Sequence, residues 1–185
     1  ARVGSVLSGP ELLAISDCLR GLRRHKAAIE KEHPDDYPLL RDLVAHVGIH
    51  RDLEERIESV IDPEGAVMDS ASPDLRKLRS KIGSVRNRID ERMRALLASH
   101  LDSGHLQDRI ITNRRGRPCV PVRSSSRSSV PGVVHDISSS GQTVFIEPSS
   151  VVADGDLLQQ LVAAEQEEVH RILREVTEDV GDHAE

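Results

Sequence analysis

The chain has 185 residues, a formal net charge of −6 and 30% charged residues. Tyr37 and Phe145 are its only aromatic residues, so the core must be aliphatic, which favours helices packed along seams over a compact globular enzyme. There is no run of about 18 apolar residues and no signal peptide, which predicts an intracellular protein without a membrane partner. Cys18 and Cys119 lack zinc-binding spacing and are expected to be free thiols. Both ends of the sequence fall inside apparent elements, so it is expected to be part of something longer.

Three helices are predicted at about residues 9–31, 38–46 and 52–60. Ser8 and Glu11 form a capping box ahead of an apolar stripe, which places the start of the first helix. Residues 33–36 are expected to break it. Asp52 with Glu55 is predicted to cap the third helix.

A long basic helix is predicted from Ser72 to Ser99, because a capping serine, a first-turn proline and Asp74 precede apolar residues at steps of three and four. A second stripe begins at Leu157 on an acidic segment. The two should form an antiparallel pair with complementary charge. Exposed ion pairs contribute only a few tenths of a kcal/mol each, so the apolar seam should dominate its stability.

Four short strands are expected between these helices, at Arg109–Thr112, Pro118–Arg123, Val130–His135 and Thr143–Ile146. Residues 113–116 form a hairpin turn between the first two, and residues 138–141 a turn between the last two. Pro118 and Pro121 suit only edge positions, since proline cannot donate to a ladder. The serine-rich residues 124–129 are expected to be a mobile link.

The sequence from His135 to Pro148, H-D-I-S-S-S-G-Q-T-V-F-I-E-P, has no catalytic signature. Consecutive strand residues point to opposite faces, so its histidine, aspartate and serines do not form a triad. The whole chain also lacks a P-loop and a metal-ligand set, which predicts no catalytic residue, no metal and no cofactor in this segment. Asp136 and Ser138 should bond turn amides, and Phe145 should lie in the core with Ile146. Glu147 should close the turn or pair with an arginine. The residues given a structural role in this motif are His135, Asp136, Ser138, Gly141, Phe145, Glu147 and Pro148.

Charge is distributed unevenly: residues 109–134 hold six arginines and no acid, whereas residues 147–185 hold eleven acids. The six arginines could neutralise several phosphates of a nucleic acid. Without exposed aromatic residues, contacts would be to backbone and shape rather than stacked bases. The alternative is a solvated basic surface that pairs with the acidic helix. The candidate nucleic-acid-binding residues are Arg114, Arg115, Arg117, Arg123 and Arg127.

The sequence also resembles the middle of the second subfamily of MutS proteins, relatives of mismatch-repair MutS that lack the mismatch-reading domain. The resemblance covers nearly the whole chain, and its most specific motif is the stretch from His135 to Pro148. The other matching segments are residues 7–8 with 11–13, 61–65 with 69–73, 106–108, 110–112, and 116–117 with 120–122.

The resemblance implies a helical core portion (1–70), a first lever helix (71–100), a β clamp (101–153) and a second lever helix (154–185). It further implies an ATPase that uses ATP and Mg, and in many members a small nuclease domain, both outside this segment. The parent protein would be a cytoplasmic bacterial homodimer, associated with the nucleoid or the ribosome. It would act on branched DNA to restrain recombination, or on collided ribosomes.

Two departures from the family pattern stand out. Pro118 and Cys119 replace an aromatic and a β-branched residue, which predicts a shortened strand. Residues 153–156, Ala-Asp-Gly-Asp, replace the usual start of the return helix, which suggests a hinge at Gly155.

The expected fold is α+β, mainly α, with two long antiparallel helices and a small β clamp at their tip. The expected function is a non-catalytic clamp and lever that grips branched or duplex DNA or a ribosome. The alternative is a structural coiled-coil interaction or dimerisation module without nucleic-acid contacts of its own.

Overall fold

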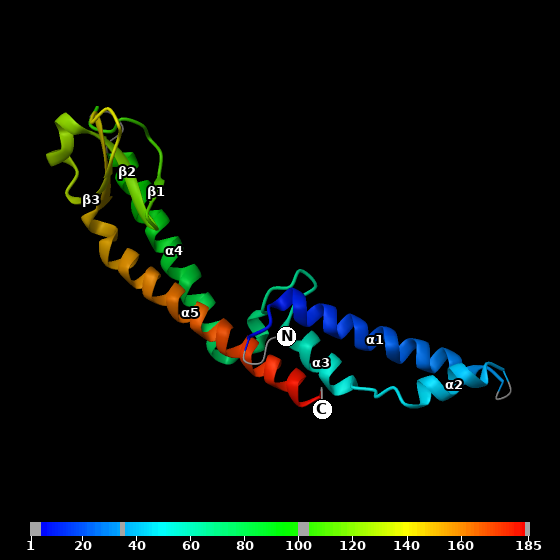
Figure 1. Ribbon diagram of the computed structural model, residues 1–185. Coiled ribbons are helices and arrows are strands. Elements are labelled where there is room, and N and C mark those ends of the chain that lie inside the picture. The colour runs from blue at the N-terminus through cyan, green and yellow to red at the C-terminus, as the bar shows by residue number, and fades with distance from the viewer. Residues whose placement is uncertain (1–4, 34–35, 100–103, 184–185) are drawn as a thin grey trace. The chain divides into compact units, whose positions relative to one another are not determined.

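The computed structural model describes residues 5–33, 36–99 and 104–183. The chain is mainly helical and carries one small antiparallel sheet (Figure 1), which confirms the α+β, mainly α class. It divides into two compact units, one of Ala1–Arg76 with Gln166–Glu185 and the other of Lys77–Glu165. Among the described helices, none combines the length and the apolar character needed to cross a bilayer.

The first unit is helical, and its three predicted helices are confirmed. They are α1 (Gly9–Lys31), α2 (Pro38–Ala45) and α3 (Arg51–Val60), followed by the 3-10 turn η1 (Asp69–Ala71). Within the helix break expected at residues 33–36, Pro34 and Asp35 lie outside the described residues. The first turn of α4 (Pro73–Ser99) and the last turns of α5 (Ser149–Asp182) complete this unit's core. That core is aliphatic, with Leu12, Leu53, Ile57, Val60, Leu75, Ile172 and Val176 all buried.

The start of α1 follows the predicted capping box. The backbone N–H of Ser8 donates to the Glu11 carboxylate at 2.8 Å, and the Ser8 hydroxyl donates to the same carboxylate at 2.7 Å. The cap predicted for α3 is wrong: the helix begins at Arg51 with His50 in the capping position and no side-chain cap. The Asp52 carboxylate instead lies 3.1 Å from His183 Nε2.

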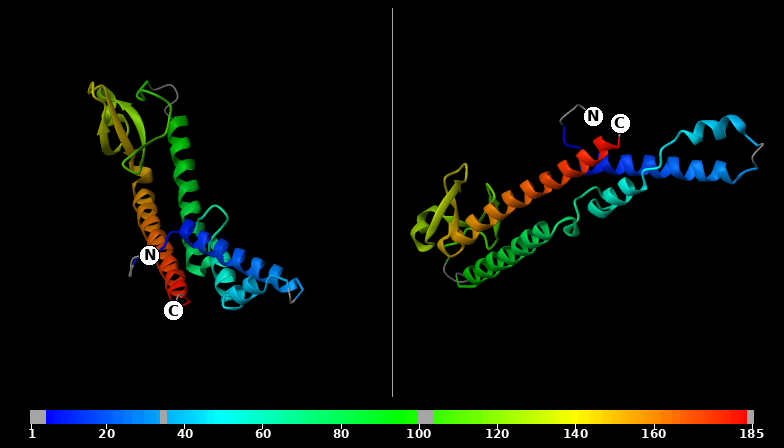
Figure 2. Two further views of the ribbon diagram at one scale, coloured as in Figure 1. Left: turned by 45° about the vertical axis from the view of Figure 1, so that its right-hand side comes forward. Right: turned by 90° about the horizontal axis from the view of Figure 1, so that it is seen from below.

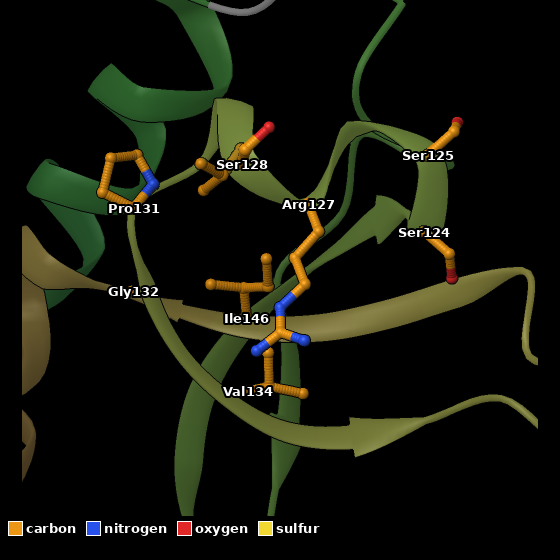
Figure 3. A pocket seen from close by; sticks show the side chains of 9 residues that line it. Ser124, Ser125, Arg127, Ser128, Pro131, Gly132, Val134 and Ile146 are labelled. Carbon is orange, nitrogen blue, oxygen red and sulfur yellow. The ribbon is translucent and has the colours of Figure 1, made fainter.

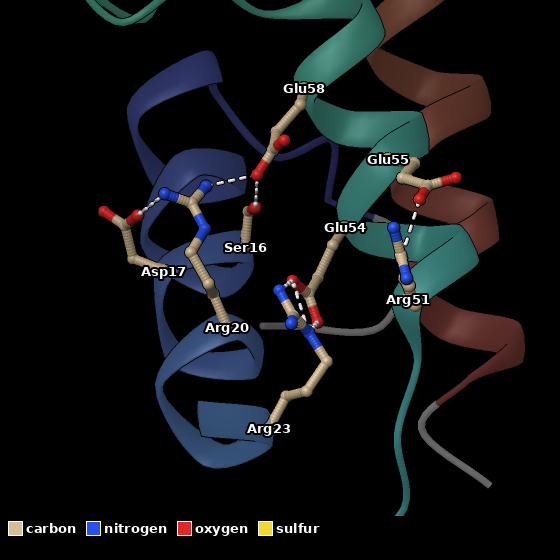
Figure 4. Close-up of polar contacts among 8 residues, drawn as sticks. All are labelled: Ser16, Asp17, Arg20, Arg23, Arg51, Glu54, Glu55 and Glu58. Carbon is tan, nitrogen blue, oxygen red and sulfur yellow. Dashed lines mark hydrogen bonds and ion pairs between the residues drawn. The ribbon is translucent and has the colours of Figure 1, made fainter. Parts of the chain in front are cut away.

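A set of ion pairs joins α1 to α3 (Figure 4). Arg23 holds the nearly buried Glu54 carboxylate with two nitrogens, at 3.0 and 2.9 Å. Arg20 pairs with Glu58, which also accepts from the Ser16 hydroxyl at 3.3 Å. The hydrogen bond from Arg23 lowers the pKa of Glu54. Each of these charged groups has a partner on the facing helix, so the network adds polar contacts between α1 and α3 to the aliphatic core.

The second unit pairs the end of α4 (Pro73–Ser99) with the beginning of α5 (Ser149–Asp182). Arg79 lies 2.8 Å from Glu165, while Arg92, farther along α4, lies 2.7 Å from Asp154. Later positions on α4 thus meet earlier positions on α5, which confirms an antiparallel pair with complementary charge (Figure 2). The seam beneath is apolar, with Val85, Ile89 and Met93 buried.

The sheet has four strands in the order β1-β2-β4-β3. They are β1 (Thr112–Arg114), β2 (Arg117–Arg123), β3 (Gly132–Ile137) and β4 (Thr143–Pro148), all paired antiparallel. Cys119 on β2 is fully buried, as are Val120, Val122 and Ile146 nearby. Burial raises the pKa of the Cys119 thiol to about 11. Val120, Val122 and Ile146 pack with side chains of α4 into one core.

The first strand lies later in the chain than the predicted Arg109–Thr112. Arg115 and Gly116 have φ angles of 53° and 79°, which makes a tight two-residue turn of the kind that suits the twist of a hairpin. Gly116 N–H donates to Asn113 Oδ1 at 2.8 Å. This turn pairs Arg114 with Arg117 and so moves the first strand to residues 112–114.

Pro118 and Pro121 were expected at an edge, but β2 lies between β1 and β4. The Pro121 carbonyl accepts from Gln107 N–H at 2.9 Å, so the nitrogen of Pro121 also faces that side, away from the ladder with β4. Pro118 lies beyond the end of that ladder, which stops at Val120 paired with Ile146. Each proline therefore occupies a position where β2 does not need a donor.

Residues 124–129 were expected to be a mobile link, but they form the 3-10 helix η2 (Ser124–Ser129). Ser124 fixes its start: its N–H donates to Gln142 O at 2.9 Å and its hydroxyl donates to Gly141 O at 2.5 Å. Serine hydroxyls satisfy backbone groups in this way where regular ladders end.

Candidate nucleic-acid interface

A buried carboxylate lies at the centre of the second unit. Glu147 on β4 has a side chain only 1% exposed, and its Oε2 lies 2.6 Å from His135 Nε2 on β3. Its Oε1 lies 3.3 Å from a guanidinium nitrogen of Arg117 on β2. Arg117 also pairs with Asp156 on α5. We call Glu147, His135, Arg117 and Asp156 the Glu147 cluster. Because a buried charge is tolerated only when it is paired, the cluster ties three strands to the helix.

Arg114 is also held in place. Its guanidinium carbon lies 4.0 Å from the centre of the Phe145 ring, within cation–π distance. Its Nε lies 3.6 Å from an oxygen of Asp136. Phe145 was expected in the core with Ile146, but it is only half-buried because it lies beneath this arginine on the sheet face.

The turn between β3 and β4 uses its polar residues as local hydrogen-bond partners. Asp136 Oδ1 accepts from Ile137 N–H at 2.9 Å, and Ser138 Oγ accepts from Thr143 N–H at 3.0 Å. Gly141 has a φ of 70°, a left-handed conformation that favours glycine. At the opposite end of this strand pair, Pro148 ends β4 paired with Gly132. Asp136, Ser138 and Gly141 fold the turn and do not converge on a common site.

Three of the five candidate arginines remain exposed. Within the part of the chain that the structure describes, no ion pair holds Arg115, Arg123 or Arg127. We call these three the free arginines. Arg115 lies in the turn before β2, and Arg123 and Arg127 lie at and after its other end. A seven-residue strand is roughly 20 Å long, so the free arginines are spread along the sheet.

The sequence could not separate paired from free arginines. Arg117 is 17% exposed because its partners come from residues 147 and 156, which no local pattern relates to it. The one available signal was the approach of acidic α5 to the basic segment. It identified the kind of partner but not which arginine it would take.

Comparison with known proteins gives no match to any family model. Among individual proteins, the chain is 38% identical to Endonuclease MutS2 of Pelotomaculum thermopropionicum over 181 residues, 98% of this chain and 23% of that protein. It is 41% identical to Endonuclease MutS2 of Thermus thermophilus over 178 residues, 96% of this chain and 23% of that protein. The chain is related to a segment of MutS2 proteins. It spans about a quarter of the length of these relatives.

Residues 153–156, where a hinge at Gly155 was suggested, lie inside a continuous α5. The helix is unbroken at Gly155. A Cβ at this position would lie 2.4 Å from Glu147 Oε1 and 2.9 Å from a guanidinium nitrogen of Arg117. Glycine here makes room for the Glu147 cluster against the helix.

The neighbouring Asp154 joins the two long helices of the MutS2-related segment. Its side chain is 9% exposed, and its two oxygens lie 2.5 Å from Arg88 and 2.7 Å from Arg92. The hydrogen bond from Arg88 is the main reason that its pKa is lowered. Three consecutive residues of α5 thus contact the rest of the second unit. Asp154 pairs with α4, Gly155 leaves room for Glu147, and Asp156 pairs with Arg117.

Proposed function

We propose that the second unit grips the sugar–phosphate backbone of nucleic acid as the clamp of a MutS2-type protein, with α4 and α5 as its levers. The observation that carries this proposal is the group of free arginines, on a segment without acids between residues 109 and 134. Each such guanidinium can release one condensed counterion by neutralising a phosphate. Their spread along β2 suits several phosphates of one strand better than a single small anion.

In this proposal the paired arginines build the clamp and the free arginines contact the ligand. Arg117 cannot leave Glu147 without removing a charged partner from a buried carboxylate. Arg114 is already engaged with Phe145 and Asp136. The remaining contacts are to phosphates and carry little sequence information.

For the longer protein, we propose a cytoplasmic bacterial homodimer whose ATPase, with ATP and Mg, lies outside this chain and moves the levers. The relatives carry the name endonuclease, and we assign no catalytic residue to the present segment. Branched DNA and the collided ribosome are the two targets that fit a clamp without base readout.

The test is fluorescence anisotropy with a labelled four-way DNA junction and a matched duplex across a salt series. Replacing Arg115, Arg123 and Arg127 together with alanine should weaken binding and reduce the slope of log affinity against log salt by up to about 2.7, since each phosphate contact contributes roughly 0.9. A matched control replaces Arg24, Arg76 and Arg174, exposed arginines of the first unit, and should change the slope little. Equal slopes for the two triple variants would contradict the clamp.

A second candidate, an interaction or dimerisation module, is favoured by α2. This helix has no buried residue, and Leu39, Leu40 and Leu43 on it are 85%, 45% and 67% exposed. An apolar surface of this kind commonly marks a protein contact. Sedimentation velocity over a range of concentrations distinguishes the two: a monomer at all concentrations that still binds DNA argues against the module.

A further inference from the structure

A pocket opens beside Arg127 in the second unit, between η2 and the strands β3 and β4 (Figure 3). Its volume is about 440 Å³, within the range of pockets that hold small organic ligands. Ser125 and Ser128 of η2 line it, as do Pro131, Val134 and Ile146. All the residues that line it lie between Ser124 and Ile146 in the chain, so the pocket belongs to the second unit alone.

The two sides of this pocket differ in chemistry. Ile146 is 1% exposed and belongs to the buried core of the unit, with Val134 packed against that core. Their side chains give the pocket an apolar floor. Arg127 extends from η2 across this floor, with its guanidinium between Val134 and Ile146 (Figure 3). It has no ion pair in the described part of the chain.

An apolar floor beneath an unpaired guanidinium limits the possible ligands. A free phosphate would gain from Arg127 and the serine hydroxyls but would leave the apolar floor unused. An aliphatic group would cover the floor but would desolvate a charge without pairing it, which is unfavourable. A nucleobase on its sugar–phosphate chain satisfies both requirements, since guanidinium planes stack on bases and the backbone supplies the negative charge.

We propose that the Arg127 pocket receives one unpaired nucleobase of the bound nucleic acid, stacked on the Arg127 guanidinium over the floor of Val134 and Ile146. This inference rests on the proposed clamp function and specifies its ligand: a strand with at least one unpaired nucleotide. Every base has a flat π face, so the pocket selects for unpaired bases and not for sequence. It would make a branched or gapped structure a better ligand than a continuous duplex.

The test compares two labelled probes, a continuous 30-base-pair DNA duplex and the same duplex with a three-nucleotide single-stranded gap. The unchanged chain should bind the gapped probe at least about fivefold more tightly, in keeping with stacking of one base. Arg127→Lys keeps the charge but loses the planar stacking surface. It should remove most of this preference while leaving the salt dependence on the duplex unchanged. Arg115→Lys, at a free arginine outside the pocket, is the matched control and should retain the preference.

A second variant tests the floor independently of charge. Val134→Thr changes little in volume and places a hydroxyl where the base would lie, so it should reduce the gap preference about two- to threefold, with circular dichroism confirming the fold. Equal binding of both probes by the unchanged chain, or a preference that survives Arg127→Lys, would overturn the pocket and leave the clamp proposal standing. If neither the duplex nor the gapped probe bound at low salt, the pocket proposal and the clamp proposal would both be overturned.

Discussion

At the scale of single residues, the buried carboxylate of Glu147 is the polar centre of the second unit. It is nearly inaccessible to solvent, yet it contacts His135 and Arg117 from two other strands. Gly155 allows this arrangement because α5 approaches so closely that a side chain there would meet the carboxylate. A substitution that looks helix-stabilising should therefore be harmful at this position.

Gly155→Ala should lower the free energy of unfolding by roughly 1–3 kcal/mol, because overpacking outweighs the gain in helix propensity of about 1 kcal/mol. The new methyl group would push Glu147 Oε1 away from Arg117. Gly83→Ala on α4 is the control, since apart from its chain neighbours and the adjacent backbone of its own helix, no described atom lies within 4 Å of its Cβ position. It should stabilise the chain by up to about 1 kcal/mol. Urea unfolding followed by circular dichroism measures both, and equal effects would contradict the role of Gly155.

Much at this scale could not be predicted from the sequence. The composition identified a basic segment and an acidic helix, but Arg117 and Arg115 are two residues apart with opposite fates, one paired inside and one exposed. Side-chain partners separated by 30 or more residues depend on how strands and helices pack, and no local pattern encodes them. The close approach of Gly155 to Glu147 was missed for the same reason, since Glu147 lies on a strand and not on the same helix.

At the scale of elements, the start of α4 is joined to α5 within the first unit. Ser72 Oγ accepts from Leu75 N–H at 2.9 Å and donates to Glu168 Oε1 at 2.7 Å. Arg171 lies 2.7 Å from the same carboxylate. The guanidinium of Arg171 first, and the Ser72 hydroxyl second, lower the pKa of Glu168 from 4.5 to about 2.

This arrangement predicts an acid dependence of stability. The pKa of Glu168 is lower in the folded chain than in the unfolded chain, so its contribution is fully present above pH 4.5 and is lost as the pH falls toward about 2. Glu168→Gln should reduce the unfolding free energy near pH 6 by on the order of 1 kcal/mol, after solvent screening of the exposed Arg171. The difference from the unchanged chain should shrink between pH 4.5 and 2. A difference independent of pH, or an equal effect of Glu167→Gln at an exposed neighbour, would contradict this linkage.

Helices were predicted more accurately than strands for a physical reason. The capping residues near Ser8 and Ser72 and the apolar repeat lie within one segment, so the local sequence determines where α1 and α4 begin. The position of β1 instead follows from the left-handed conformation of Arg115 and Gly116. A hairpin turn was predicted at residues 113–116, but arginine rarely adopts that conformation, so the shorter two-residue form of the turn was not evident from the sequence.

At the scale of the whole molecule, each of the two units has its own core, and α2 contributes no side chain to either. Its exposed leucines are therefore available for a contact that the described chain does not make internally. Substitutions on α2 should therefore change self-association more than they change the free energy of unfolding.

Replacing Leu39 and Leu43 with glutamate should change the unfolding free energy by less than about 0.5 kcal/mol, as for surface positions generally. The same double variant should weaken any self-association seen by sedimentation velocity, because it places like charges in an apolar contact. Nucleic-acid binding by the free arginines should be unaffected. A loss of stability above 2 kcal/mol would contradict the exposed position of α2.

The burial of Cys119 gives the chain a built-in chemical probe. Cys18 is exposed and Cys119 is buried, and only a deprotonated, accessible thiol reacts quickly with a maleimide. The native chain should therefore take up one label at once, at Cys18 in the first unit, so a dye can be attached without mutagenesis. Later alkylation of Cys119 requires the sheet to open, and its rate should report how often that happens. If bound DNA slows this second reaction but not the first, the ligand stabilises the second unit.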